Sequence, residues 1–307
     1  MCDAVVLSLA DPPDAGTVRV PVRACADALA AAGARVERVT ATSDRQVDAV
    51  LARFDAPPRA DGLTWPDPVP GAVRLVVATA ADSQLRAVVR RMVRRWTPPR
   101  SRRPPDLPPG RTLPGLPPVA VLPLDPTGTA PPRDLAAQLG LPRDPAAVAA
   151  AALGGRVRRL DLLRTDAGSV TLDGALFGGT DDAGRAVTWR GRVEVDGAVL
   201  SAGDEPLLVA LVANAAGYVR PDGLPLVEHA DPADGRVRVA VAVPVRRRWH
   251  RTVRVEVRRG EGRAAVVVPA GAGVACLDDG VAGAVSRGRT WWVEPAAWAV
   301  YTSPDPA

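Results

Sequence analysis

The sequence contains no lysine and no isoleucine, so all 39 of its basic residues are arginines. Without lysine the chain cannot supply the phosphate-binding lysine of a P-loop nucleotidase, the strand lysine of a protein kinase or a Schiff-base amine. Histidine occurs only as His229 and His250, and asparagine only as Asn214. A histidine-based metal centre is therefore not expected either.

Cysteines, aromatic residues and long apolar runs are also scarce. The three cysteines, Cys2, Cys25 and Cys276, have neither metal-site nor disulfide spacing, which is typical of reduced thiols in a cytosolic protein. No apolar run approaches the roughly 20 residues of a membrane span. The N-terminus has no basic region ahead of an apolar stretch, so we expect no signal peptide and a cytoplasmic location.

Arginine dominates the charge, with a net charge of +5 and a pI of about 10.0. Guanidinium groups pair well with phosphate, whether on nucleotides, nucleic acid or anionic lipid. Aromatic residues make up 4% of the chain, too few for the stacking platforms of single-strand binders, so we expect no nucleic-acid partner. Arg90, Arg91, Arg94 and Arg95, with Trp96, could meet anionic lipid head groups or form a solvated helix face.

Strands and helices alternate through residues 1–156. Apolar or alternating runs predict strands at 4–9, 35–39, 73–78 and 119–122. Helical periodicity predicts helices at 20–32, 43–53, 82–95, 134–139 and 145–153. This alternation favours a Rossmann-like, three-layer α/β domain with a parallel sheet. The proline-dense and arginine-rich segment 97–118 is expected to be an extended loop, either a basic lipid-facing flap or a solvated excursion.

From residue 157 to 307 the pattern changes to short alternating segments separated by Gly, Asp and Pro turns. We expect strands at 157–163, 168–176, 187–195, 207–213, 236–243, 252–258, 264–268 and 291–293. This rhythm predicts a second domain, an antiparallel β-sandwich, over residues 157–307.

Several motifs follow one another in an order that resembles the diacylglycerol kinase catalytic-domain family. Thr127-Gly128 follows the strand at 119–122, and Leu-Gly-Leu-Pro stands at 139–142. Residues 209–218, a strand ending in Asn214 and a Gly-Tyr turn, precede a Pro-Ala-Asp-Gly motif at 232–235. Leu277-Asp278-Asp279-Gly280 resembles the late Asp-Gly-Glu motif of the family.

The resemblance implies a lipid kinase that transfers the γ-phosphate of ATP to a lipid hydroxyl with Mg²⁺. The nucleotide would lie in the cleft between the two domains, near the carboxyl ends of the strands. Asp279 would be the base, or else a plain turn residue, and Asp231 and Asp234 would lie at a structural Mg²⁺ site, or else in a turn. Nucleotide contacts would come from residues matching three family loops: Asp11, Asp82, Ser83, Thr127 and Gly128.

The phosphate-binding motifs depart from the family pattern. The expected Gly-Gly-Asp-Gly-Thr reads Ala80-Ala81-Asp82-Ser83-Gln84, so Asp82 survives and every glycine is lost. Cβ atoms obstruct the close approach of backbone N–H groups to a phosphate. Asp82 could instead cap the helix at 82–95. The late motif reads Asp279-Gly280-Val281 and has lost its acid.

Three hypotheses about function therefore remain open. The first is a diacylglycerol kinase-like lipid kinase, weakly active or inactive, acting on a lipid at the inner face of the plasma membrane as a peripheral protein. The second is a catalytically dead pseudokinase that serves as a lipid-binding or interaction module. The third is a nicotinamide-nucleotide kinase, which fits the α/β half but fits the region around Asn214 and Asp234 less well. The oligomeric state is open, and a dimer is compatible with all three.

Overall fold

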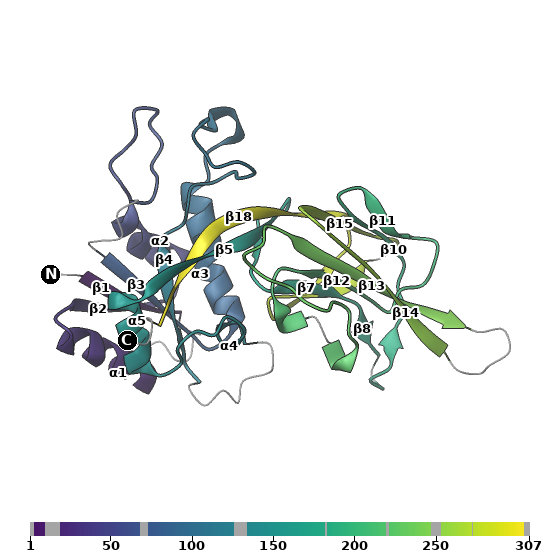
Figure 1. Ribbon diagram of the computed structural model, residues 1–307, viewed down its shortest axis with the longest axis horizontal. Helices are drawn as coiled ribbons and strands as arrows, with labels where there is room; N and C mark the ends of the chain where they lie inside the picture. Colours follow the sequence, from purple (N-terminus) through teal and green to yellow (C-terminus); the bar gives the residue numbers. More distant parts are fainter. Residues whose placement is uncertain are drawn as a thin grey trace. The chain divides into compact units, whose positions relative to one another are not determined.

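A computed structural model of the 307-residue chain describes residues 3–9, 19–67, 73–125, 134–181, 183–218, 221–246, 253–271 and 273–303. The chain divides into two compact units, which are described separately below (Figure 1). The first comprises Met1–Leu160 together with Ala296–Ala307, and the second comprises Asp161–Pro295.

A parallel sheet forms the centre of the first unit. Its strands are β1 (Asp3–Leu9), β2 (Arg35–Ala41), β3 (Val73–Thr79) and β4 (Pro118–Pro123), in the order β4-β3-β1-β2. The strands β1, β3 and β4 are apolar and buried along most of their length, as expected for a parallel sheet covered by helices on both faces, whereas the edge strand β2 is polar and mostly exposed. Their carboxyl ends meet at one edge of the sheet, so the loops after β3 and β4 lie together, and the N–H of Leu124 donates to the carbonyl of Thr79.

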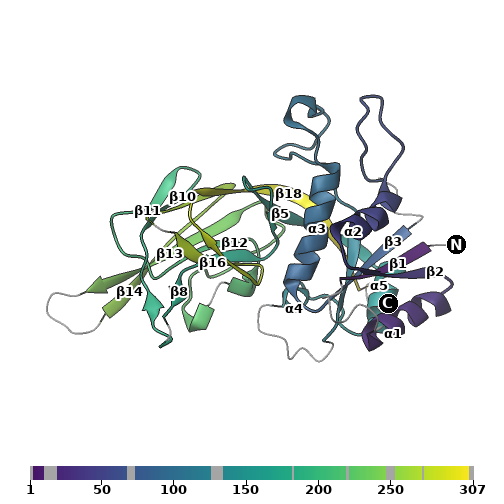
Figure 2. The same ribbon diagram turned by 180° about the vertical axis from the view of Figure 1, so that it is seen from behind.

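Helices cover both faces of this sheet (Figure 2). One face packs against α1 (Val20–Ala31) and α5 (Pro145–Gly154), whose Val22, Leu29 and Val148 are buried with Val6 and Val76 of the sheet. The other face carries α2 (Asp44–Leu51), continued by η2 (Ala52–Phe54), and α3 (Asp82–Trp96). The short elements η3 (Arg100–Arg102) and α4 (Leu135–Gln138) complete the unit. The predicted three-layer α/β domain is confirmed.

The last strand of the chain, β18 (Arg289–Thr302), returns to the first unit. Its residues Ala299 and Val300 pair in parallel with Pro118 and Val119 of β4. We expected the first domain to end near residue 156 and the rest of the chain to belong to the second domain. The division by spatial proximity instead falls after Leu160 and gives Ala296–Ala307 to the first unit, because this pairing joins the end of β18 to the parallel sheet.

The second unit is a β-sandwich. One sheet contains β10 (Gly191–Val195), β11 (Ala198–Ala202), β15 (Ala264–Pro269) and the first part of β18, with β5 (Arg156–Thr165) and β6 (Val170–Thr171) beside it. The other sheet has the order β14-β13-β12-β7-β16-β17, formed by Val253–Gly262, Val237–Arg246, Val209–Ala213, Gly174–Phe177, Val274–Asp278 and Val281–Val285. The remaining elements are β8 (Gly179–Thr180), β9 (Ala186–Val187), η4 (Ala216–Tyr218) and η5 (Pro221–Gly223).

The core of the sandwich lies between its two sheets. Val193, Val267 and Trp291 from one sheet pack against Phe177 and Val239 from the other, and all five are buried. The rings of Phe177 and Trp291 meet edge to face with centroids 5.6 Å apart. The predicted antiparallel β-sandwich is confirmed. Among the described residues, no helix is long and apolar enough to cross a membrane.

Candidate functional site

The connection between β3 and α3 is held by a hydrogen bond between residues only four positions apart. Its residue Ala81 is the N-cap of α3, so Asp82 is the first residue of the helix rather than its cap. The side-chain oxygen of Gln84 accepts a hydrogen bond from the backbone N–H of Ala80 at 2.8 Å. An amide at this position would face a phosphate in a glycine-rich loop, and here the side chain of Gln84, in the first turn of α3, satisfies it.

Asp82 is likewise bound within the first unit. Both of its carboxylate oxygens accept the N–H of Leu135, at 3.1 and 3.0 Å. Asp134, the N-cap of α4, accepts the N–H groups of Ala136 and Ala137, and its second oxygen pairs with Arg143 at 2.5 Å. The two carboxylates therefore bind the beginning of α4.

Of the remaining nucleotide candidates of the first unit, the described part of the chain includes Ser83. Ser83 lies in the first turn of α3 and is partly buried. Asp11, Thr127 and Gly128 lie outside the described residues. The described β3–α3 loop has no glycine, and its Ala80 amide is already bound to Gln84, so this loop as it lies does not fit a nucleotide phosphate.

In the second unit, Asp279 occupies the hairpin turn between β16 and β17. Asp279 and Gly280 have φ angles of 48° and 79°, as a two-residue type I′ turn requires. The carboxylate of Asp279 is buried and accepts three backbone N–H groups, from Leu172 at 2.7 Å, Asp173 at 2.9 Å and Gly174 at 3.2 Å. This carboxylate thus holds the turn between β6 and β7 in place.

Other buried polar side chains of the second unit also form hydrogen bonds with backbone groups. The amide of Asn214 donates to the carbonyls of Asp161 and Leu172, at 3.1 and 2.8 Å. Asp173 accepts the N–H of Gly217 at 3.0 Å, and Asp161 accepts the N–H of Gly235 at 2.6 Å. These side chains satisfy buried backbone groups of three connecting loops, which fixes the loops relative to one another inside the second unit.

The two candidate metal ligands lie in an exposed turn. One oxygen of Asp231 accepts the N–H of Ala233 at 3.0 Å, and one oxygen of Asp234 accepts the N–H of Arg236 at 3.0 Å. Asp234 also forms an ion pair with Arg238. An arginine on the carboxylate competes with a cation, and the described residues contain no group of three or more acidic, histidine or cysteine ligands. These residues as they lie do not fit Mg²⁺.

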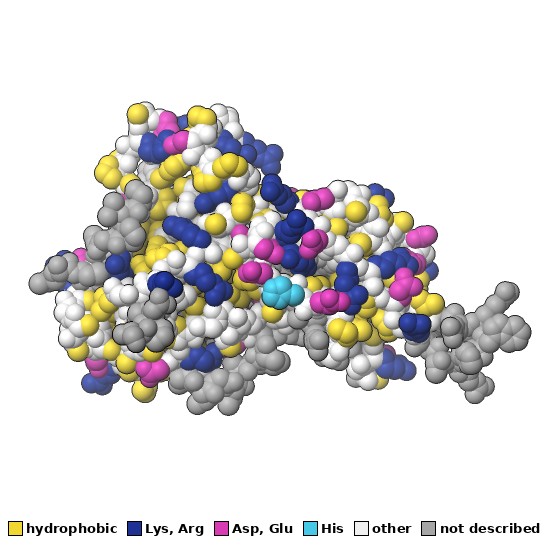
Figure 3. All heavy atoms as spheres, viewed as in Figure 1, with side chains coloured by type: hydrophobic (Ala, Val, Ile, Leu, Met, Phe, Trp, Pro, Cys, Tyr) yellow, Lys and Arg dark blue, Asp and Glu magenta, His cyan; other side chains and the backbone are white. Residues whose placement is uncertain are grey.

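Two of the four arginines in the run on α3 pair within the first unit. Arg91 donates to Asp44 at 2.9 Å and also binds Asp48, while Arg95 binds Asp55. Trp96 is buried and donates its indole N–H to Asp55 at 3.0 Å. Figure 3 shows basic side chains dispersed among acidic and uncharged ones on the face in view rather than gathered in one patch. Arg91, Arg95 and Trp96 therefore hold α3 against the α2 region, whereas Arg90 and Arg94 are exposed.

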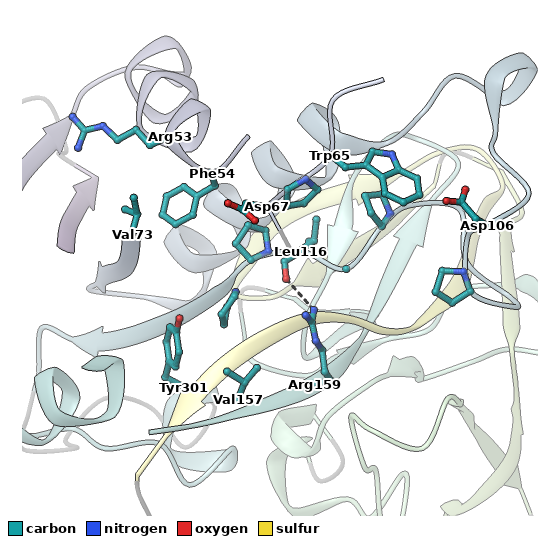
Figure 4. Close-up of a pocket in the computed structure, with 16 residues that line it drawn as sticks. Arg53, Phe54, Trp65, Asp67, Val73, Asp106, Leu116, Val157, Arg159 and Tyr301 are labelled. Atoms are coloured by element: carbon teal, nitrogen blue, oxygen red, sulfur yellow. Dashed lines mark hydrogen bonds between the residues drawn. The ribbon is translucent and has the colours of Figure 1, made fainter. Parts of the chain in front are cut away.

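Sequence reasoning missed a cavity in the first unit, of about 440 Å³ (Figure 4). It lies at the amino ends of β3 and β4, beside Val73 and Pro118, whereas the Ala80–Gln84 loop follows the carboxyl end of β3. Its walls come from the segment after η2, the proline-rich loop, β5 and the end of β18. The apolar residues Phe54, Trp65 and Tyr301 are up to 247 positions apart in the chain. They line one cavity only because β18 returns to this unit, which is why no local sequence pattern indicates the cavity.

Comparison with known proteins supports the fold. No family model matches the sequence, and no curated protein does. The structure is similar to that of a candidate diacylglycerol kinase from Bacillus anthracis str. Sterne, with a TM-score of 0.62 and 13% identity over 98% of this chain and 97% of the other. A diacylglycerol kinase from the same organism gives a TM-score of 0.58 at 13% identity, with the same coverage. The chain therefore has the two-domain fold of diacylglycerol kinase-like proteins over nearly its whole length.

Proposed function

We propose that this chain is a non-catalytic protein with the diacylglycerol kinase-like fold, acting by binding a ligand or partner rather than by phosphoryl transfer. The observation that carries the proposal is the hydrogen bond from the Ala80 N–H to Gln84, at the position where the resemblance expects a glycine-rich phosphate loop. A phosphate at this place would have to displace the Gln84 side chain and approach past the Cβ atoms of two alanines.

The acidic candidates support the same proposal. Asp82 accepts the N–H of Leu135, and Asp279 accepts three backbone N–H groups while nearly the whole residue is buried, with 1% of its surface exposed. A general base has to come within hydrogen-bond reach of the proton it takes. The carboxylate of Asp279 faces the backbone N–H groups of residues 172–174 and not solvent.

A lipid kinase is the second candidate function. It is favoured by the fold, which matches over nearly the full chain, and by the sequence resemblance, in which Asp82 and Asp279 match acidic residues of the family motifs. In that case ATP and Mg²⁺ would bind only after the Ala80–Gln84 loop had opened. The protein would then act in the cytoplasm on a lipid at the inner face of the plasma membrane, as a monomer or dimer.

A turnover assay on the full chain distinguishes the two functions. The purified protein is mixed with Mg-ATP and vesicles that contain diacylglycerol, and ADP release is followed. We expect no release above that of vesicles alone. Lipid-dependent ADP release that falls in both Asp279→Asn and Asp82→Asn, with each variant folded by circular dichroism, would establish the kinase and overturn the proposal.

A further inference from the structure

The cavity at the amino ends of β3 and β4 has the composition of a small-molecule site. Its volume of about 440 Å³ lies in the usual range for ligand pockets. Phe54, Pro66, Leu116, Pro117 and Tyr301 line it and are buried, so the walls are apolar and packed from behind. The seven residues of β3, about 20 Å of strand, separate it from the Ala80–Gln84 loop, so it is distinct from the candidate nucleotide site.

Backbone hydrogen bonds hold the walls of the cavity in place. The N–H of Leu116 donates to the carbonyl of Ala297 at 2.8 Å, which joins the proline-rich loop to the end of β18. Asp55 and Pro66 form an isolated β-bridge, and the N–H of Asp67 donates to the carbonyl of Phe54 at 2.8 Å. A cavity built on such contacts is formed before a ligand arrives, which lowers the entropic cost of binding.

One cation, Arg159 of β5, faces the cavity with donors to spare. Its Nη1 donates to the carbonyl of Leu116 at 2.9 Å, as the dashed line in Figure 4 shows. A Cβ added to Gly115 would lie 3.0 Å from the same Nη1, so glycine at this position leaves room for the guanidinium. Partial burial lowers the pKa of Arg159, and no carboxylate of the described residues offsets this effect. The side chain nevertheless keeps part of its surface exposed, within reach of a ligand.

The other charged residues at the cavity are already paired or bear negative charge. Arg53 pairs with Glu37 at 2.7 Å, and Asp106 pairs with Arg59 at 3.0 Å. Asp67 adds a further carboxylate to the lining. A ligand with a single negative charge therefore fits this surrounding better than a dianion does, and the planar fork of a guanidinium matches a carboxylate with two hydrogen bonds.

We propose that this cavity binds a small amphiphilic monocarboxylate, whose carboxylate pairs with Arg159 and whose apolar body lies against Phe54, Trp65 and Tyr301. The site goes beyond the proposed function and does not depend on whether the chain turns over ATP. It also assigns a role to the proline-rich loop, because Pro114–Pro118 forms one wall of the cavity.

Calorimetry with octanoate, octanol and octyl phosphate on the full chain tests the proposal. These probes share the apolar body and differ in head group. Octanoate is expected to bind, and Arg159→Gln to weaken it at least about tenfold, because a charge-assisted hydrogen-bonded pair is lost. Arg158→Gln is the matched control, since Arg158 lies next to Arg159 on β5 and donates to the carbonyl of Leu139 instead. This control should leave octanoate binding unchanged.

A second variant covers the possibility that Arg159→Gln unfolds. Val157 is 41% exposed, lines the cavity and lies two residues from Arg159 on the same strand, so the two side chains share a face. Val157→Glu would place a carboxylate beside Arg159 and should abolish octanoate binding. The proposal would be overturned if octanoate did not bind, if octanol bound as tightly as octanoate, or if octyl phosphate bound more tightly. It would also be overturned if octanoate binding were unchanged in Arg159→Gln or in Val157→Glu. None of these results bears on ADP release, which tests the proposed function separately.

Discussion

The backbone N–H of Ala80 donates to the side chain of Gln84, and the same arrangement recurs just before α2, where the N–H of Thr42 donates to Gln46 at 2.6 Å. In each case a glutamine in the first helical turn satisfies an amide just ahead of the N-cap residue. In each of these loops the amide just ahead of the N-cap residue is therefore already bound by a side chain. An amide satisfied in this way is not available to an anion unless the glutamine moves away.

Restoring the glycine motif should therefore create nucleotide binding. The variant carries Ala80→Gly, Ala81→Gly, Ser83→Gly and Gln84→Thr, which frees the Ala80 amide and removes the obstructing Cβ atoms. Saturating Mg-ATP should raise its Tm by about 2–4 °C, since ligand at ten times Kd contributes about 1.4 kcal/mol. The wild-type chain should show no shift. Gln46→Thr loses the equivalent cap at α2 and is the control; a variant that responds no more than this control would refute the explanation.

Removing the charge of Asp279 should destabilise the second unit. Asp279→Asn keeps the size of the side chain but replaces one acceptor oxygen by an NH₂ group, which would face backbone N–H groups of residues 172–174. We expect the free energy of unfolding to fall by about 2 kcal/mol or more. Urea denaturation measures this, with Asp231→Asn in an exposed turn as the control. Unchanged or raised stability in Asp279→Asn would mark a residue retained for chemistry rather than for folding.

The arginines of α3 should separate into a structural set and a solvated one. Arg95 binds Asp55, which also accepts the indole N–H of Trp96, whereas Arg94 is exposed. Arg95→Ala should lower the free energy of unfolding by about 1–3 kcal/mol, because Asp55 loses a charged partner. Arg94→Ala should change it by less than about 0.5 kcal/mol. Equal effects of the two substitutions would contradict the proposed role of Arg95 in packing.

Alkaline pH should destabilise the first unit through Cys25. Burial raises the pKa of the Cys25 thiol from its ordinary 9.0 to about 12, with a smaller contribution from Asp144. Below about pH 9 the thiol is protonated in both folded and unfolded chains; above it only the unfolded chain loses the proton. Stability should thus fall by up to about 1.4 kcal/mol per pH unit. Urea denaturation between about pH 9 and 11 should show a steeper loss for wild type than for Cys25→Ala, and parallel losses would count against a buried, protonated thiol.

Local patterns predicted most of the first unit. Its four parallel strands and its main helices lie within a few residues of their predicted positions, because each has one strong periodic signal. The segment 291–293 was predicted as a short strand, but β18 runs from Arg289 to Thr302. Pro295 and the positive φ of Ala296, 52°, interrupt the pattern, and only the pairing with β4 explains why the strand continues.

The motifs that carried the resemblance proved to be mainly structural. Asn214 and Asp279 hold buried backbone groups, and Asp234 lies in an exposed turn paired with Arg238. Residues that stabilise a fold keep their type and spacing whether or not catalysis occurs, so the sequence indicates the fold better than the activity. The hydrogen bonds of Gln84 and Asp82 depend on side-chain geometry, which spacing alone does not reveal.

Titration calorimetry of the full-length chain with Mg-ATP at millimolar concentration is the most direct test of the central claim. The closed Ala80–Gln84 loop predicts no heat of binding beyond dilution and no accompanying rise in Tm. A saturable heat with one-to-one stoichiometry, absent with Mg²⁺ alone, would show that the loop opens to hold a nucleotide and would contradict the claim that this fold is used without phosphoryl transfer.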